Sequence, residues 1–115
     1  MNFKEKVVQA VKMIPKGRVV SYGQVAVACG SPRAARQVGW VLHTLDGGNS
    51  VPWWRVINNL GLISIKGNMI STPQVQKQFL EQEKIIVSDD YKIDINKYRY
   101  NYFSASGLKK NEKPR

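Results

Sequence analysis

Near the start of the chain, hydrophobic residues recur at the spacing of one face of a helix. Five apolar side chains share that face: Phe3, Val7, Val8, Val11 and Ile14. Lysines occupy the other side, and the sequence Pro15-Lys16-Gly17 interrupts the pattern. The pattern predicts an amphipathic first helix that packs its apolar face on a core.

Two helix-start signals follow close together. Ser21 is followed three residues later by Gln24, which forms a capping box, and the helix it begins meets a glycine stop at Cys29-Gly30. Ser31-Pro32 is a second start signal and predicts a helix over residues 33–43. Two helices joined by a short turn that contains glycine indicate a helix-turn-helix.

The later part of the chain alternates short, largely apolar runs with turn residues. Residues 56–57 and 62–65 are separated by a turn sequence over residues 58–61, which predicts a β-hairpin where a winged helix-turn-helix carries its wing. Residues 85–87 and 91–93 flank the sequence Ser-Asp-Asp and predict a second, smaller hairpin.

A last helix is predicted to start at Thr72-Pro73. Its inward side chains are Val75, Phe79 and Leu80. From residue 104 the chain is rich in Ser, Gly, Lys, Asn and Pro, so we expect residues 104–115 to form a flexible basic tail. Residues 1–103 are predicted to form one mostly α domain with small β-hairpins, a winged helix-turn-helix.

The charge of the chain indicates a polyanionic partner. Its 115 residues include 18 Lys and Arg against 8 Asp and Glu, which gives a formal net charge of +10. Basic residues exceed acidic ones both before and after residue 83, so the tail alone does not account for the charge. Nucleic acid is the first candidate partner and an anionic membrane surface the second, with a merely solvated positive face as the alternative.

The counts of cysteine and histidine exclude several kinds of site. Cys29 is the only cysteine and His43 the only histidine, so an internal disulfide and a metal site rich in cysteine or histidine are both excluded. His43 lies in no recognisable nucleophile motif. There is no long apolar run and no signal-peptide core near Met1. We expect a cytoplasmic protein with no metal or other cofactor.

The start of the predicted second helix of the helix-turn-helix is unusual for a helix that identifies bases. Ala34 and Ala35 stand where long donors usually lie, flanked by Arg33 and Arg36. Small residues allow close approach to a duplex without selecting a sequence, while Arg33 can contact phosphates. The planar guanidinium of Arg36 can enter the base stack. The alternative is two alanines in the core and two surface arginines.

Three aromatic residues are candidates for contact with a nucleic acid. Tyr22 directly follows the helix cap at Ser21, so it can press against a phosphate or base, or pack on the hairpin. Trp53 and Trp54 lie on a segment predicted to be extended, which would point them to opposite sides. One indole is then in the core and the other is exposed for stacking, and the spacing does not decide which.

Three stretches together resemble the DNA-binding domain of the O6-alkylguanine-DNA alkyltransferases. They are residues 14–26, residues 31–39, and the sequence Pro52-Trp53-Trp54-Arg55-Val56, where the transferases have Pro-Cys-His-Arg-Val. Trp53 therefore occupies the position of the alkyl-accepting cysteine. This replacement is typical of the alkyltransferase-like proteins, which bind O6-alkylguanine in duplex DNA, do not repair it, and flag it for nucleotide excision repair.

The resemblance implies roles for individual residues. Tyr22 would rotate the 3′ phosphate, and Arg36 would fill the gap left by the flipped nucleotide. Trp53 would line the lesion pocket, with the carbonyls of Trp53 and Val56 facing the guanine edge, and Lys66 would help to hold the alkylated base. Further DNA contacts are expected from Ser21, Ser31, Arg33, Ala34, Ala35, Gln37 and Arg55. We expect a monomer that binds DNA in the nucleoid and hands the lesion to excision-repair proteins.

The sequence departs from the resemblance at a second position. Trp54 stands where the transferases have the histidine that links their cysteine, through water, to a glutamate, which aligns with Glu83. Without the cysteine that relay has no task. On this basis Trp54 can pack into the core while Trp53 faces the pocket.

Two other functions are weighed against lesion recognition. An ordinary winged helix-turn-helix transcription factor would need base-selecting side chains at Ala34 and Ala35. A divergent alkyltransferase would need another acceptor, and Cys29 is the only thiol.

Overall fold

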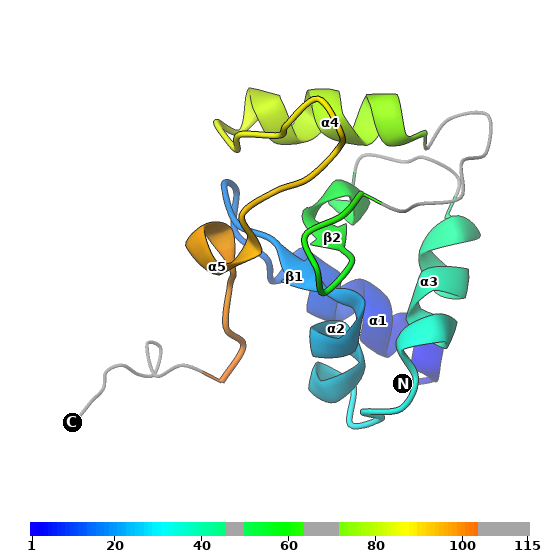
Figure 1. The fold of residues 1–115 in the computed structure, drawn as a ribbon. Coiled ribbons are helices and arrows are strands. Elements are labelled where there is room, and N and C mark those ends of the chain that lie inside the picture. The colour runs from blue at the N-terminus through cyan, green and yellow to red at the C-terminus, as the bar shows by residue number, and fades with distance from the viewer. Residues whose placement is uncertain (46–49, 64–71, 104–115) are drawn as a thin grey trace.

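A computed structural model of the chain describes residues 1–45, 50–63 and 72–103 (Figure 1). The first helix, α1 (Phe3–Lys12), forms where the apolar pattern predicts it and buries Val7, Ala10 and Val11. Asn2 caps α1 by accepting a hydrogen bond from the Glu5 amide at 2.8 Å. No helix in the described ranges is long and apolar enough to cross a membrane.

The second helix, α2 (Tyr22–Ala28), begins with the predicted capping box. The Ser21 hydroxyl accepts from the Gln24 amide at 3.1 Å, and the Gln24 side chain accepts from the Ser21 amide at 3.0 Å. The α2 helix ends before Gly30, whose φ of +79° lies in the left-handed region that favours glycine.

The third helix, α3 (Ala35–His43), begins later than the start predicted at residue 33. The Ala34 amide donates to the Ser31 carbonyl at 2.9 Å, so the backbone closes a turn over residues 31–34 before the helix starts. Ala34 is the N-cap residue and no side chain caps the helix. The predicted start signal at Ser31-Pro32 therefore forms a turn, and α3 begins where this turn ends. The α3 helix packs against α2.

The first predicted hairpin does not form as two paired strands within the described residues. Strand β2 (Val56–Ile57) pairs in parallel with strand β1 (Val20–Ser21), and these two strands form the sheet within the described residues. A turn does follow β2, because the Gly61 amide donates to the Asn58 carbonyl at 2.9 Å. The Asn58 amide also donates to the Leu62 carbonyl at 3.0 Å across this turn, and Leu62 forms an antiparallel bridge with Lys92 of a distant segment.

Gly61 makes this distant pairing possible. Its φ is +85°, and the Ile93 backbone lies so close that a Cβ atom at Gly61 would be 2.2 Å from the Ile93 carbonyl oxygen. The Gly61 carbonyl accepts from the Ile93 amide at 2.8 Å. Residues 64 and 65 of the predicted return strand lie outside the described residues.

The second predicted hairpin forms only as a turn. The Ser88 amide donates to the Lys92 carbonyl at 2.9 Å, and the flanking residues form no named strand. A short helix that the pattern did not predict, α5 (Ile95–Tyr98), follows and is capped by Asp94. The next residues run beside β1, because the Tyr100 amide donates to the Val19 carbonyl at 2.8 Å.

The helix α4 (Pro73–Gln82) starts at the predicted site, with the Thr72 hydroxyl accepting from the Val75 amide at 3.1 Å. The two strands separate α4 from the other long helices: α4 lies on one side of them, and α1, α2 and α3 lie on the other (Figure 1). Leu80 is buried as predicted, and Phe79 is half-buried against the core.

Two hydrophobic clusters hold these layers together. The first joins α1, α2 and α3 to Trp53 and Val56, and the second joins Val19 and Ile57 to α4 and α5. Trp54 packs against both clusters. The result is the predicted mostly helical small domain, with a two-stranded parallel sheet in its described part in place of the hairpins.

Candidate nucleic-acid interface

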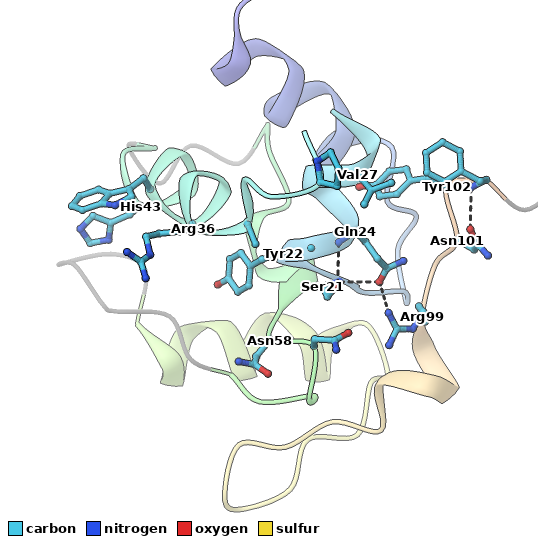
Figure 2. A pocket seen from close by; sticks show the side chains of 17 residues that line it. Ser21, Tyr22, Gln24, Val27, Arg36, His43, Asn58, Arg99, Asn101 and Tyr102 are labelled. Atoms are coloured by element: carbon cyan, nitrogen blue, oxygen red, sulfur yellow. Dashed lines mark hydrogen bonds between the residues drawn. The ribbon is translucent and has the colours of Figure 1, made fainter. Parts of the chain in front are cut away.

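A broad groove crosses the surface where α2 and α3 meet (Figure 2). Its volume is about 1210 Å³. One wall is the face of α3, the floor is the start of α2, and the remaining sides are the turn at Asn58 and the C-terminal segment from Arg99 to Phe103. No Asp or Glu is among the described residues that line it. A cationic, carboxylate-free groove of this size suits a polyanion.

Tyr22 is at the centre of this groove, on the first turn of α2. The ring is half-buried and its hydroxyl points toward open space between Arg36 and Asn58 (Figure 2). Burial raises the pKa of the Tyr22 phenol, so it is protonated and can donate at neutral pH. Among the described residues, no hydrogen bond to this hydroxyl forms, which leaves it available to a ligand.

Gly39 explains how Tyr22 fits between the two helices. A Cβ atom at Gly39 would lie 3.9 Å from Cε1 of Tyr22, so the ring rests against the bare backbone of α3. Ala35, one turn earlier on α3, also lines the groove. The small residues on this side of α3 keep the surface next to Tyr22 shallow.

Arg36 is exposed and its guanidinium extends into the groove from α3 (Figure 2). It forms no ion pair within the part of the chain that the structure describes. Arg36 and Tyr22, assigned to nucleotide flipping by the resemblance, therefore lie on one surface from adjacent helices.

The other residues predicted to contact DNA divide into two sets. Ser21 and Ala35 line the same groove, although Ser21 is 3% exposed and its hydroxyl is the cap of α2. A smaller neighbouring hollow of about 400 Å³ is lined by Ser31, Pro32, Arg33, Ala34 and Gln37. The predicted backbone contacts thus border the groove at the start of α3.

The two indoles do not lie as the predicted extended segment would place them. Residues Trp53–Arg55 form a single 3-10 turn, η1, and the rings of Trp53 and Trp54 meet edge to face with centroids 5.9 Å apart. Both rings also contact Phe79 of α4, at 6.1 Å and 4.7 Å. Trp53 is only 4% exposed and is not part of the groove wall, while Trp54 is half-buried.

Hydrogen bonds from the side chain of Gln76 hold the backbone of η1 and of the residue after it. The buried Gln76 amide group donates to the carbonyls of Trp54 and Val56, both at 3.0 Å, and its own oxygen has no partner within the described residues. The Trp53 carbonyl accepts from the Val56 amide. Both carbonyls that the resemblance assigns to the guanine edge therefore have protein partners here. Lys66, assigned to the alkylated base, lies outside the described residues.

Arg55, predicted to contact DNA, faces inward. Its guanidinium donates to Glu83 at 2.7 Å and to the Ile14 carbonyl at 2.8 Å, and its side chain is 14% exposed. Glu83 also accepts from the Trp54 indole at 2.8 Å and from the Gly17 amide at 2.9 Å. Burial by itself raises the pKa of the Glu83 carboxyl, but these hydrogen bonds and the Arg55 charge bring it below its ordinary value. In this structure the Arg55 guanidinium therefore binds groups within the protein and supports the fold.

The groove also contains residues that the sequence patterns did not select. Arg99 donates to the Gln24 side chain at 2.8 Å (Figure 2). Gln24 in turn donates to the Tyr100 carbonyl at 2.7 Å. Trp40 lies one helical turn beyond Arg36, a spacing that could have identified it. Arg99 is far from α2 along the chain, so only the fold brings it to the groove.

Comparisons with known proteins show the family of this chain. Residues 2–85 match the family described as 6-O-methylguanine DNA methyltransferase, DNA binding domain. The DNA base-flipping protein of Escherichia coli (strain K12) is 48% identical over 101 residues, which are 88% of this chain and 76% of the relative. Alkyltransferase-like protein 1 of Schizosaccharomyces pombe is 40% identical over 100 residues, 87% of this chain and 89% of that protein.

A solved structure is similar throughout the domain. The crystal structure of S. pombe Atl1 in complex with damaged DNA containing O6-carboxymethylguanine superposes with a TM-score of 0.79 at 39% identity, covering 86% of this chain and 94% of that one. The chain belongs to the family of the O6-methylguanine DNA methyltransferase DNA-binding domain.

Proposed function

We propose that this protein recognises O6-alkylguanine in duplex DNA, flips the damaged nucleotide out of the stack and leaves the alkyl group in place. The observation that carries the proposal is the joint position of Tyr22 and Arg36 on one cationic groove beside the small residues Ala35 and Gly39. The relatives named for base flipping, and the similar crystal structure of S. pombe Atl1 in complex with damaged DNA, support it.

In this proposal the α3 helix enters the minor groove with Ala34 and Ala35 against the duplex. The Tyr22 hydroxyl donates a hydrogen bond to the 3′ phosphate, and the ring displaces the DNA backbone. Arg36 fills the space that the flipped nucleotide leaves in the base stack. Flipping costs a few kcal/mol and costs least for a base whose pairing is already weakened, which supplies part of the selectivity for alkylated guanine. Ser31, Arg33 and Gln37 hold the flanking backbone from the neighbouring hollow.

The lesion pocket would form around η1. Trp53 is buried, so the base would meet the edge of this segment, and Lys66 would help to hold it. The Gln76 amide fixes the η1 backbone beneath that site.

The absence of alkyl transfer follows from the side chain at the acceptor position. An indole at Trp53 offers no thiolate to accept an alkyl cation. Cys29, the only thiol, lies at the end of α2, is 7% exposed, and burial raises its pKa, so it stays a neutral thiol. We therefore propose a non-enzymatic lesion sensor that presents the damage to excision-repair proteins.

A titration with lesion-bearing and plain duplexes of one sequence, each at two salt concentrations, tests this function. Tighter binding to O6-methylguanine DNA is the expected result, with a salt slope that counts phosphate contacts. Equal affinity for the two duplexes would overturn lesion recognition. Tight binding to one defined undamaged sequence would instead favour a transcription factor.

A further inference from the structure

The face of α3 that borders the groove continues well past Arg36. Three large side chains, Arg36, Trp40 and His43, follow one another at spacings of four and three residues, so they form a single row along the helix. Ala35 and Gly39 form the small row beside them. The groove therefore has one wall of large side chains along most of the length of α3.

Trp40 is conspicuous in this row because it is 64% exposed. Trp53, by contrast, is 4% exposed. The Trp40 ring meets the His43 ring edge to face, with centroids 6.3 Å apart and an interplanar angle of 88°. The indole is thus supported on one side by His43 and leaves its remaining area to solvent, in a position where a ligand can cover it.

The charge around Trp40 indicates what covers it. Arg36 and Arg99 line the same groove, and none of the described residues lining it is acidic. The chain as a whole carries a formal net charge of +10. Arg36 lies one helical turn before Trp40, while Arg99 lines the opposite part of the groove and donates to Gln24 (Figure 2). An exposed aromatic ring beside a cation, in a groove without carboxylates, is a combination with which proteins hold nucleic acid, since the cation meets phosphates and the ring meets sugars or bases.

We propose that Trp40 is a further DNA contact, which lies against the sugars and base edges of the duplex beyond the gap that Arg36 fills. The inference rests on the proposed function for the direction in which DNA docks. Four residues of helix advance about 6 Å, so Trp40 meets the duplex about that far along α3 from Arg36. A flat apolar ring there adds contact area that does not depend on the base sequence or on the lesion.

This contact has a recognisable pattern of effects. Because Trp40 lies outside the lesion position, it contributes equally to lesion-bearing and plain duplexes. Because an indole neutralises no phosphate, its removal leaves the salt slope unchanged. Both features separate Trp40 from Arg36, which acts at the gap and carries a charge.

The test compares the wild type, Trp40→Ala, Trp40→Phe and Leu60→Ala on O6-methylguanine and plain duplexes. Leu60 is the matched control because it is 76% exposed and apolar but lies off the groove. Trp40→Ala is expected to weaken binding to both duplexes about tenfold, with the lesion-to-plain ratio and the salt slope preserved, while Trp40→Phe retains most of the affinity. Wild-type affinity of Trp40→Ala for both duplexes would overturn the proposal.

Tryptophan fluorescence gives a second readout that does not depend on the alanine variant. Plain duplex is expected to quench wild-type emission more strongly than that of Trp40→Phe, which retains Trp53 and Trp54. Equal quenching of the two proteins would contradict the contact. A wild type that binds both duplexes equally would defeat the proposed lesion recognition, yet a loss of plain-duplex affinity in Trp40→Ala would still support this inference.

Discussion

Arg55 and Glu83 form an inward-facing ion pair in which Nη2 and Oε2 are 2.7 Å apart, with side chains 14% and 6% exposed. Glu83 follows the last residue of α4, and Arg55 is the last residue of η1. The Gly17 amide and the Trp54 indole donate to the same carboxylate, so one side chain joins three separate segments. This network holds in place the segment in which Trp53 replaces the acceptor cysteine.

Removing the charge of Glu83 is expected to destabilise the domain. Glu83→Gln leaves the Arg55 guanidinium without a counter-charge, which for a pair largely removed from water costs about 3 kcal/mol in the free energy of unfolding. Urea unfolding measures it. Glu81→Gln, on the exposed side of α4, is the control and should change stability little. Equal stabilities of the two variants would show that the pair contributes nothing net.

The same carboxylate predicts a pH dependence. The pKa of Glu83 is lower in the folded protein than its ordinary 4.5, so the unfolded chain binds the proton more tightly. The stabilisation from Glu83 is then fully present above about pH 4.5 and is lost as the pH falls through the folded pKa. The stability difference between wild type and Glu83→Gln should therefore shrink on acidification, and a constant difference would contradict the assignment.

Arg36→Ala is expected to weaken binding to O6-methylguanine DNA by about tenfold or more, because the flipped nucleotide then leaves an unfilled gap. Arg18→Ala is the matched control, since it removes the same charge from an exposed arginine off the groove. Fluorescence anisotropy at one salt concentration compares them. If both variants lose affinity equally, Arg36 contributes only its charge.

Tyr22→Phe removes only the hydroxyl that points into the groove. The loss of one hydrogen bond to a phosphate should cost about 1 kcal/mol or more in binding, with no change in fold. Tyr91→Phe is the control, because Tyr91 is not among the residues that line the groove. Lesion affinity equal to the control would make Tyr22 a packing residue.

Gly39→Ala is expected to change stability and binding in opposite directions. A methyl group at Gly39 would make ordinary contact with the Tyr22 ring, 3.9 Å away, and alanine is better than glycine inside a helix by about 1 kcal/mol. The variant should therefore unfold at higher urea but bind DNA more weakly, because the methyl fills the shallow surface beside Tyr22. Unchanged DNA affinity would mean that the duplex does not approach α3 this closely.

How far the sequence predicts this fold depends on whether the determinants are local. The capping box of Ser21 and Gln24 and the apolar face of α1 involve neighbours in the chain, and both form as predicted. After Ile57 only the turn of the predicted hairpin forms within the described residues, because β2 pairs with β1 and Leu62 bridges Lys92, and both of these segments are far away in the sequence. Local turn residues do not determine such pairings.

The same distinction applies to the candidate site. The surface of α3 around Arg36 follows from helical spacing, and the structure places Tyr22 beside it. The burial of Arg55 could not be predicted from its position next to two indoles, because its partner Glu83 comes from the end of another helix. The C-terminal wall at Arg99 likewise depends on the pairing of Tyr100 with Val19.

The most direct test of lesion recognition without repair is a competition. The wild-type protein is mixed with equimolar O6-methylguanine and plain duplexes in excess, the bound DNA is isolated, and its modified base and the mass of the protein are both measured. We expect bound DNA enriched in intact O6-methylguanine and a protein of unchanged mass. Equal amounts of the two duplexes in the bound fraction, or a protein heavier by one methyl group, would contradict this expectation.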